Sequence, residues 1–320
     1  MTIDERESKS SAPKDISPLD NGVLDNLASP NNANEKGPFN TLLVRSLTGI
    51  VYVGVIVGCL IGGPIFYLIL FGLLTGFLTW EFCTIINAGL QLSINRFITT
   101  IASVYFFFSM FDYTVDMTGK GVGIFIPFVL TLMYLLISEM YFPGYRKIEN
   151  WAFSFMAFLY ISLPMSMTHY LLFISSPDGM LYTWIVLLSV FIFLWVSDSG
   201  AYLIGSLFGR HRLFPSVSPK KSWEGSIGGG LLAMCVSQLI ASFSDVMNSE
   251  STLQNHLLWL GLSVVVVVFG TWGDLVESRL KRKLGVKDSG NILPGHGGWL
   301  DRLDSALMAI PASVIYLYFV

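Results

Sequence analysis

Long apolar stretches separated by short polar connectors run along the chain from residue 46 to residue 320. Most are close to the roughly 20 residues that a helix needs to cross a bilayer. The pattern predicts nine membrane-spanning helices, near residues 46–62, 64–87, 97–113, 121–142, 151–174, 181–206, 225–243, 256–276 and 304–320. We therefore expect an all-α, polytopic membrane protein with about nine transmembrane helices, whose two termini lie on opposite sides.

Residues 1–40 have a different character from the rest of the chain. They are rich in Ser, Asn, Asp and Pro and show no helical apolar period, so they cannot bury enough surface to offset the entropy of ordering. They also lack the basic start and short apolar core of a secretory signal peptide. We expect a retained, disordered cytoplasmic tail over 1–40 and a transmembrane domain over 41–320.

Composition agrees with a membrane protein. Hydrophobic residues make up 53% of the chain and charged residues only 13%, which excludes a water-soluble globular protein. The net charge of −3 comes from the tail, because the rest of the chain holds 15 acidic and 15 basic residues. Cys59, Cys83 and Cys235 lie singly in separate apolar stretches, so neither a disulfide framework nor a zinc site is expected.

The distribution of basic residues predicts the orientation. A cytoplasmic N-terminus puts 14 of the 15 basic residues beyond the tail on the cytoplasmic side and leaves only Lys120 outside. Cytoplasmic loops of membrane proteins are enriched in Lys and Arg, so this orientation is favoured. Two of these loops, 207–224 and 277–303, are long, polar and rich in Gly and Pro, which is typical of functional loops. A basic collar that touches anionic lipid is the alternative.

Five carboxylates lie where apolar helices meet the cytoplasmic side: Asp198, Asp274, Glu277, Asp301 and Asp304. The spacing of Asp274 from Glu277, and of Asp301 from Asp304, puts each pair on one helical face. Clustered carboxylates need cations, and oxygen ligands combined with substrate phosphates suit Mg²⁺. The alternative is that these acids only favour helix ends or form ion pairs with Arg279 or Lys281.

The loop 288–302 combines glycines with polar residues, namely Asp288, Gly290, Pro294, Gly295, His296, Gly297 and Gly298. Consecutive glycines allow the backbone to approach a phosphate closely. Lys281, Arg282, Lys287 and Arg302 nearby, and Lys220 and Lys221 in the other long loop, could neutralise phosphate oxygens. The loop is therefore a candidate phosphate-binding segment.

Three further features are expected to be structural. Glu81 and Glu139 lie near the cytoplasmic ends of their helices, so we expect their side chains to reach the membrane interface rather than the site. The glycine-rich run 225–230 is expected to serve helix packing rather than nucleotide binding.

At this point the residues point to a known family. The stretch 278–304 resembles the signature of phosphatidate cytidylyltransferases, also called CDP-diacylglycerol synthases, of the bacterial type. The positions that carry the resemblance are Ser278, Lys281, Arg282, Lys287, Asp288, Pro294, His296, Gly297, Gly298, Asp301, Arg302 and Asp304. Segments 197–202, 218–225 and 273–278 also resemble family segments. Trp299 departs from the family pattern, which has an aliphatic residue or Phe there.

The resemblance implies transfer of CMP from CTP to phosphatidic acid, giving CDP-diacylglycerol and pyrophosphate for phospholipid biosynthesis. It also implies Mg²⁺, with a second, monovalent cation such as K⁺ that the sequence does not place. The expected partners are CTP, phosphatidic acid and membrane lipid, with no nucleic acid, in a bacterial inner membrane; a homodimer is left open.

Residue roles follow from combining the resemblance with the chemistry above. We expect metal ligands at Asp274, Asp301, Asp198 and Asp304, and catalytic roles for Asp274, Asp301, Lys287, His296 and Arg302. Substrate contacts are expected from Lys220, Lys221, Lys281, Arg282, Ser278, Asp288, Gly297 and Gly298.

Two other functions fit a multi-span protein with these acids. A CTP-dependent polyprenol or phytol kinase would transfer the γ-phosphate of CTP to a lipid alcohol. An ion-coupled transporter is disfavoured, because the acids lie at one membrane face and no pair of broken helices in matching halves is visible.

Overall fold

The computed structural model describes residues 38–141, 149–176, 179–244, 252–290 and 297–320. Several residues named in the sequence analysis lie outside these ranges: tail residues 1–37, Pro294, Gly295 and His296. Leu43–Val320 pack as one unit.

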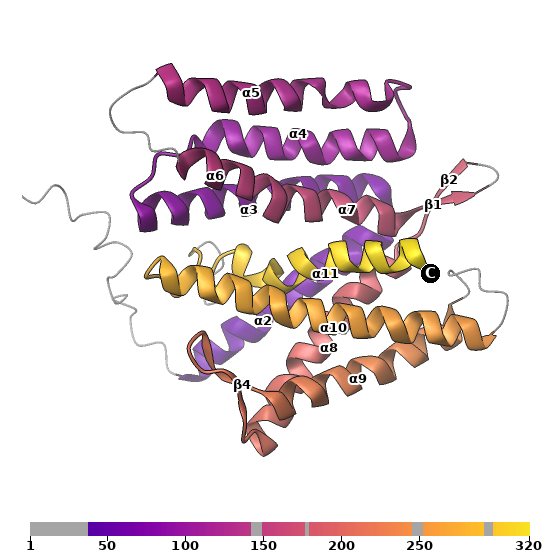
Figure 1. Cartoon of the computed structure of the whole chain (residues 1–320). Helices are drawn as coiled ribbons and strands as arrows, with labels where there is room; N and C mark the ends of the chain where they lie inside the picture. Colours follow the sequence, from indigo (N-terminus) through magenta and orange to yellow (C-terminus); the bar gives the residue numbers. More distant parts are fainter. Residues whose placement is uncertain (1–37, 142–148, 177–178, 245–251, 291–296) are drawn as a thin grey trace, which may run out of the picture. The chain divides into compact units, whose positions relative to one another are not determined.

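Helices dominate the described residues (Figure 1). They are α2 Pro38–Ile61, α3 Pro64–Leu90, α4 Arg96–Val115, η1 Gly121–Phe125, α5 Ile126–Tyr141, α6 Glu149–Ala157, η2 Phe158–Ser162, α7 Leu163–Leu172, α8 Ile185–Phe208, α9 Trp223–Phe243, α10 Thr252–Lys283 and α11 Leu300–Phe319. Two short antiparallel hairpins accompany them, β1 Phe173–Ser176 with β2 Gly179–Tyr182 and β3 Arg212–Phe214 with β4 Ser218–Ser222.

Each predicted span coincides with helical residues, which agrees with the predicted helical class. Within the described ranges, seven helical segments are long and apolar enough to cross a membrane: α3, α4, η1–α5, α6–η2–α7, α8, α9 and α10. In α2 the residues described in full include the shorter apolar helix Leu47–Ile61. In α11 the charges of Asp301, Arg302 and Asp304 occupy the first turns. The protein is thus a helical, multi-pass membrane protein.

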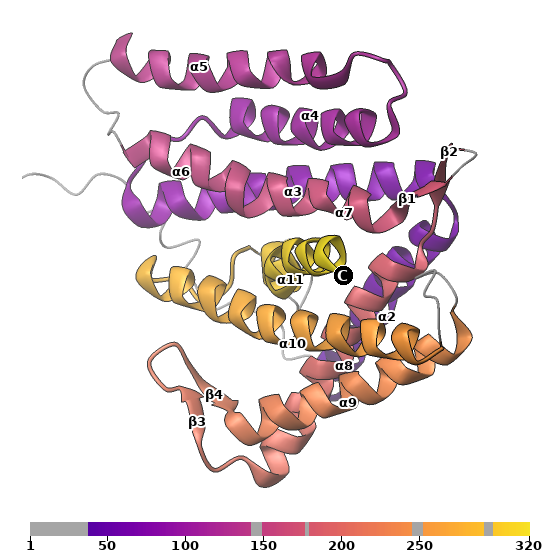
Figure 2. The ribbon, with the colours of Figure 1, turned by 45° about the vertical axis from the view of Figure 1, so that its right-hand side comes forward.

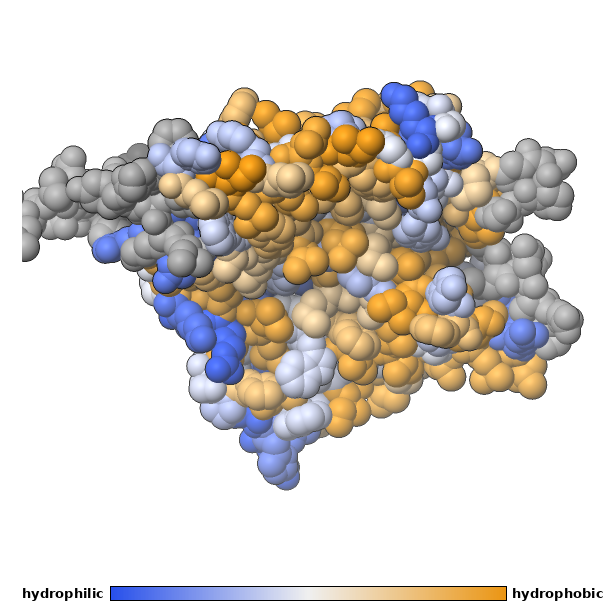
Figure 3. All heavy atoms as spheres, turned by 45° about the horizontal axis from the view of Figure 1, so that its top comes forward, coloured by the Kyte–Doolittle hydropathy of each residue, from blue (hydrophilic) through white to orange (hydrophobic). Residues whose placement is uncertain are grey.

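The outer surface of these helices is strongly apolar. Large hydrophobic side chains such as Ile65 on α3, Phe97 on α4 and Leu130 on α5 are more than half exposed. Apolar residues cover much of the face drawn in Figure 3. A water-soluble protein would not expose so much continuous apolar surface, so contact with lipid explains it.

One predicted span is helical throughout but not a regular α-helix. Between α6 and α7 the chain makes a π-helical turn over Phe158–Ser162. Pro164 follows in the first turn of α7. Proline has no N–H to donate to the preceding turn, and a locally wider turn accommodates the missing hydrogen bond.

The helix that carries two of the predicted acids, α10, packs against α8, α9 and α11 (Figure 2). In turn, α11 also packs against α7, which contacts α4. Fully buried aromatic side chains such as Trp259 on α10, Phe191 on α8 and Tyr67 on α3 fill the centre of this arrangement. Helix α11 therefore connects the α8–α10 helices with α3, α4 and α7.

Glycines let α8 and α9 approach closely, as expected for the run 225–230. A Cβ added at Gly229 would overlap the carbonyl oxygen of Ser197, and one at Gly200 would lie 3.0 Å from the Cα of Gly229. An added Cβ at Gly225 would lie 2.6 Å from the carbonyl oxygen of Ala201. Close backbone approach through small residues is a common way to pack helices in membranes. Here it sets the distance between Asp198 on α8 and the start of α9.

We expect Gly229→Ala to lower the thermal midpoint of the detergent-solubilised protein, because the added methyl meets backbone atoms that cannot move aside. Overpacking of this kind costs about 1–3 kcal/mol. Gly230→Ala is the matched control on the same helix, since its Cβ would meet only the Cγ1 of Val267 at 3.3 Å. Equal midpoints for the two variants would contradict this account of the α8–α9 interface.

Candidate active site

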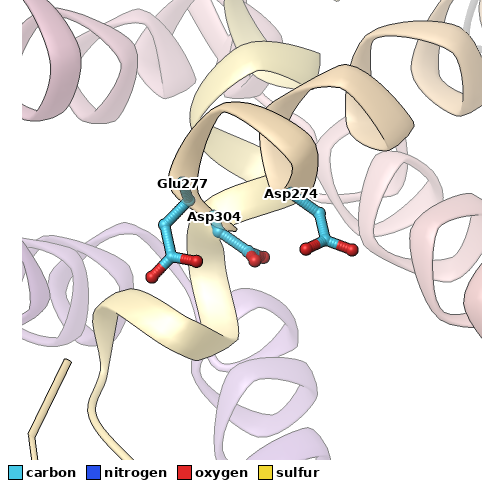
Figure 4. A group of neighbouring side chains, drawn as sticks. All are labelled: Asp274, Glu277 and Asp304. Atoms are coloured by element: carbon cyan, nitrogen blue, oxygen red, sulfur yellow. The ribbon is translucent and has the colours of Figure 1, made fainter. Parts of the chain in front are cut away.

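Helices α10 and α11 bring three carboxylates together (Figure 4). Asp274 and Glu277 lie one turn apart on α10, and Asp304 faces them from α11. One oxygen from each lies within 4.8 Å of the others. The helical spacing explains why the α10 pair shares a face, and the packing of α11 on α10 adds the third acid.

Three negative charges at this separation are unstable without compensation. At 4.8 Å two carboxylates repel by about 3 kcal/mol even at an effective dielectric constant of about 20. Two lysines supply part of the balance: Lys221 of β4 contacts Asp274, and the Lys281 Nζ lies 2.7 Å from Glu277 Oε2. Ser278 also donates a hydrogen bond to Asp274 Oδ1 at 3.1 Å.

The compensation from the described residues is incomplete. Glu277 is fully buried, and its Oε1 has no hydrogen-bond partner among the described residues. Asp304 accepts a hydrogen bond from the backbone N–H of Ser305 at 2.6 Å. A buried carboxylate oxygen without a donor is costly, and a divalent cation that prefers oxygen ligands would satisfy it. The group therefore fits a divalent metal ion.

A polar cavity of about 550 Å³ opens beside this group, between α8, the β3–β4 hairpin, α9 and α10. Asp198, Arg212, Lys220, Lys221 and Asp274 contribute its charged lining. Serine and glycine residues of α8 and α9 and of their ends make much of the remaining wall. Basic groups thus face the acids across a space large enough for a polyanionic small molecule.

The hairpin is held in place at the start of α9. Ser222 is the N-cap of α9, and its hydroxyl accepts from the backbone N–H of Gly225 at 3.2 Å. Glu224, in the first turn, accepts from the backbone N–H groups of Arg210 and His211 at 3.2 Å. It also lies 2.6 Å from His211 Nδ1. These contacts fix where Lys220 and Lys221 lie.

A second cavity, of about 280 Å³, lies between α2, α8 and α11. Its lining includes Tyr52, Trp195, Asp198 and Arg302. A smaller groove of about 110 Å³ shares Thr48 and Tyr52 with it and is lined by Val51, Val55, Ile56, Leu70, Leu74 and Trp299. Asp198 lines both the 550 Å³ and the 280 Å³ cavity, so the polar and the more apolar spaces meet at this residue.

Asp301, predicted as a metal ligand, does not lie in the three-acid group. Its Oδ1 lies 2.6 Å from Lys281 Nζ, and its Oδ2 accepts from the backbone N–H groups of Ser289 and Gly298, both at 2.9 Å. It therefore fastens the two ends of the loop between α10 and α11. Lys281, predicted to bind substrate, lies between Asp301 and Glu277 with its side chain 13% exposed.

The remaining predicted residues of the loop are placed as follows. Gly297 adopts a positive φ of 78°, and an added Cβ there would meet the Asp301 carboxylate, so both backbone and space require glycine. Arg282, Lys287 and Asp288 are exposed. His296 lies outside the described residues.

Glu277 and Glu81 have roles in the structure that the sequence analysis did not assign to them. The spacing of Glu277 from Asp274 predicts a shared helical face, and an ion pair with Lys281 is the alternative; the structure has both the shared face and the Lys281 contact. Glu81 was expected to reach the membrane interface, which is wrong: it is 4% exposed and accepts from the backbone N–H groups of Trp299 at 3.1 Å and Leu300 at 2.9 Å. No local pattern announces this contact, because its partners lie more than 200 residues away. The side chain of Glu139 is not among those described.

Comparison with known proteins agrees with this geometry. The phosphatidate cytidylyltransferases of Staphylococcus epidermidis and Staphylococcus saprophyticus are each 34% identical to this chain, over 86% of this chain and 98% of their own. The enzyme of the same name from Staphylococcus aureus is 38% identical over 59% of this chain and 70% of its own. The model of the Cytidylyltransferase family matches residues 43–320, so it includes every helix that carries the acids and both cavities. This chain belongs to the cytidylyltransferase family.

Proposed function

We propose that the protein transfers the cytidylyl group of CTP to phosphatidic acid, giving CDP-diacylglycerol and pyrophosphate. The observation that carries this proposal is the position of Asp274, one of the three acids, and of Asp198 on the wall of a lysine-lined polar cavity, where Asp198 also borders a space that continues into an apolar groove. A reaction between a water-soluble triphosphate and a membrane lipid needs both kinds of space at one point. Its relatives bear the name phosphatidate cytidylyltransferase.

CTP occupies the 550 Å³ cavity in this proposal. Lys220, Lys221 and Arg212 line it and neutralise triphosphate oxygens. Lys221 also contacts Asp274, so in this proposal its ammonium group lies between the triphosphate and the acidic group. Further phosphate contacts come from the loop between α10 and α11 and from the end of α10. The contacting residues in this proposal are Arg282, Lys287, His296, Gly297 and Gly298, and Asp288 and Ser278 support them.

Phosphatidic acid occupies the 280 Å³ cavity, with its phosphate at Arg302 and an acyl chain along the groove. The groove is lined by aliphatic residues and by Trp299, whose ring stacks on that of Phe77. An apolar groove suits an acyl chain because it keeps the hydrocarbon in surroundings as apolar as the lipid it comes from. Trp299 is larger than the aliphatic residue or Phe of the family pattern, so it narrows this groove.

In the reaction a phosphate oxygen of phosphatidic acid attacks the α-phosphorus of CTP, and the bond from the α-phosphorus to the bridging oxygen of the β-phosphate breaks. The lipid phosphate is already ionised at neutral pH, so no general base is needed. Positioning of two anions and neutralisation of their charge therefore supply most of the catalysis. The lysines, Arg212 and Arg302 hold the two substrates in line.

Asp274, Glu277 and Asp304 would hold Mg²⁺, which supplies positive charge at the phosphate oxygens when it is bound. Asp198 and Ser278 lie beside this set as supporting residues, and Asp301 keeps Lys281 in place. A second, monovalent cation such as K⁺ is part of the proposal without an assigned site.

For the membrane arrangement we propose nine spans, with α2 and α11 added to the seven segments named above. The N-terminus lies in the cytoplasm, the C-terminus lies on the opposite side, and the membrane is the bacterial inner membrane. The supporting observation is the segregation of 14 of the 15 basic residues beyond the tail. Residues 1–40 form a cytoplasmic tail outside the catalytic domain 41–320.

Product analysis tests the function. Purified protein in mixed micelles with phosphatidic acid, Mg²⁺ and CTP labelled in the cytosine ring is expected to form a lipid-soluble cytidine product and one pyrophosphate per turnover. A lipid kinase would instead leave the label in water-soluble CDP, with a lipid alcohol as the required acceptor. Recovery of labelled CDP and phosphorylated lipid alcohol, with no cytidine in the lipid phase, would refute the proposal.

Substitution of the acids tests the metal set. Asp274→Asn and Asp304→Asn keep the size of each side chain but remove charge, so activity is expected to fall by at least about 10³-fold. Binding of Mn²⁺, measured by electron paramagnetic resonance, is expected to weaken in both variants. Asp116→Asn is the control: Asp116 ends α4 in a left-handed conformation that Asn tolerates well, so it is expected to be silent. Wild-type Mn²⁺ binding in both site variants would remove Asp274 and Asp304 from the metal set.

Cysteine labelling tests the orientation. In a background without Cys59, Cys83 and Cys235, a cysteine at Ser249 is expected to react with an impermeant thiol reagent added outside intact cells. A cysteine at Ser216, exposed between β3 and β4, is expected to react only after the membrane is opened. The reverse pattern would invert the topology.

A further inference from the structure

We propose that Glu81 is a positioning residue: its carboxylate holds the first turn of α11 and thereby keeps Asp304 opposite Asp274 and Glu277. This inference rests on the proposed function, in which those three acids form the metal site. Glu81 belongs to α3, whereas the three acids belong to α10 and α11.

The burial of Glu81 calls for an explanation. It lies in an apolar membrane-spanning helix and is only 4% exposed, a position where an acid is costly unless it has partners. It accepts hydrogen bonds from the backbone N–H groups of Trp299 and Leu300 at 3.1 and 2.9 Å, and from the Ser289 hydroxyl at 3.4 Å. Two of these donors stand at the start of α11, where the helix leaves N–H groups without internal acceptors.

The loop between α10 and α11, residues 284–299, leaves space for the Glu81 carboxylate. A Cβ added at Gly290 would lie 2.9 Å from Glu81 Oε1, and one added at Gly298 would lie 2.6 Å from Glu81 Oε2. Glycine at these two positions lets the loop close around the Glu81 side chain. The loop and the carboxylate therefore form one fitted unit.

This unit is connected to Asp304 through one turn of helix. Asp304 follows Leu300 by four residues, so the position of the first turn of α11 determines where the Asp304 side chain lies. On the other side α11 rests against Gly273, where an added Cβ would lie 2.7 Å from the carbonyl oxygen of Asp304. Glu81 and Gly273 thus hold the start of α11 from two sides, and Asp301 with Lys281 adds a third link to α10.

A carboxylate is required because both of its oxygens accept. Glutamine keeps the shape but replaces one oxygen by an NH₂ group, which would face a backbone N–H donor with another donor. Glu81→Gln is therefore expected to shift the first turn of α11 without emptying the space. A misplacement of about 1 Å at a catalytic centre costs on the order of 10²-fold in rate.

The experiment compares Glu81→Gln with wild type in kcat, KM for CTP, Mn²⁺ affinity and thermal midpoint. We expect kcat to fall about 10²-fold and Mn²⁺ binding to weaken several-fold. KM for CTP is expected to change less than kcat, because most of the cavity assigned to CTP is built from α8, α9, α10 and the β3–β4 hairpin, and only the contacts of Gly297 and Gly298 move with the first turn of α11. Thr79→Val on the same helix is the matched control, since the Thr79 hydroxyl bonds only to the carbonyl oxygen of Thr75.

A second variant makes the test specific. If Gly290→Ala acts by displacing the Glu81 carboxylate, it should lower kcat too, and Gly290→Ala combined with Glu81→Gln should cost no more than the more damaging single change. Full additivity would overturn the proposal, as would a Glu81→Gln protein with wild-type kcat and Mn²⁺ affinity. A lowered midpoint with unchanged kcat per folded molecule would show a purely structural role and also overturn it.

The two proposals fail in different ways. If wild-type protein makes no CDP-lipid, the proposed function is wrong. The Mn²⁺ affinity of Glu81→Gln against wild type still decides whether Glu81 positions the acidic group.

Discussion

The mutual repulsion of Asp274, Glu277 and Asp304 is the constraint on which the rest of the site depends. Three carboxylates whose oxygens lie within 4.8 Å of one another, at the end of apolar helices, cannot stay charged without nearby positive groups. Lys221 and Lys281 approach the group from the β3–β4 hairpin and from α10 itself. Glu277 Oε1 remains without a donor among the described residues, which is the feature expected of a site built to take a cation.

The acids near the site divide into two kinds. Glu81 and Asp301 accept hydrogen bonds from backbone N–H groups. These bonds hold the loop between α10 and α11 in place. Among the described residues, Asp274 and Glu277 receive contacts from side chains, and Asp304 accepts from the N–H of its neighbour Ser305. Glu81 and Asp301 therefore position the loop and the start of α11. Asp274, Glu277 and Asp304 keep oxygens that can bind a metal ion next to substrate phosphates.

The helical surroundings separate polar from apolar space around these acids. Close packing of α8 on α9 through Gly200, Gly225 and Gly229 leaves a small-residue wall on the cavity that Lys220 and Lys221 line. The neighbouring groove between α2 and α3 is aliphatic and aromatic. An enzyme that joins a soluble nucleotide to a lipid requires this meeting of unlike spaces, and Asp198 stands where they meet.

The sequence by itself determined the helical class, the approximate helix bounds and the acids and lysines of the site, because apolar length and the 3.6-residue period are local properties. It paired Asp274 with Glu277 on one face for the same reason. Tertiary structure alone decided that Asp304 joins this pair while Asp301 turns to Lys281 and the loop amides. It also decided that Glu81 is buried against α11 rather than at the interface. Periodicity says which residues share a face, but which helix that face meets depends on packing between segments that lie far apart in the chain.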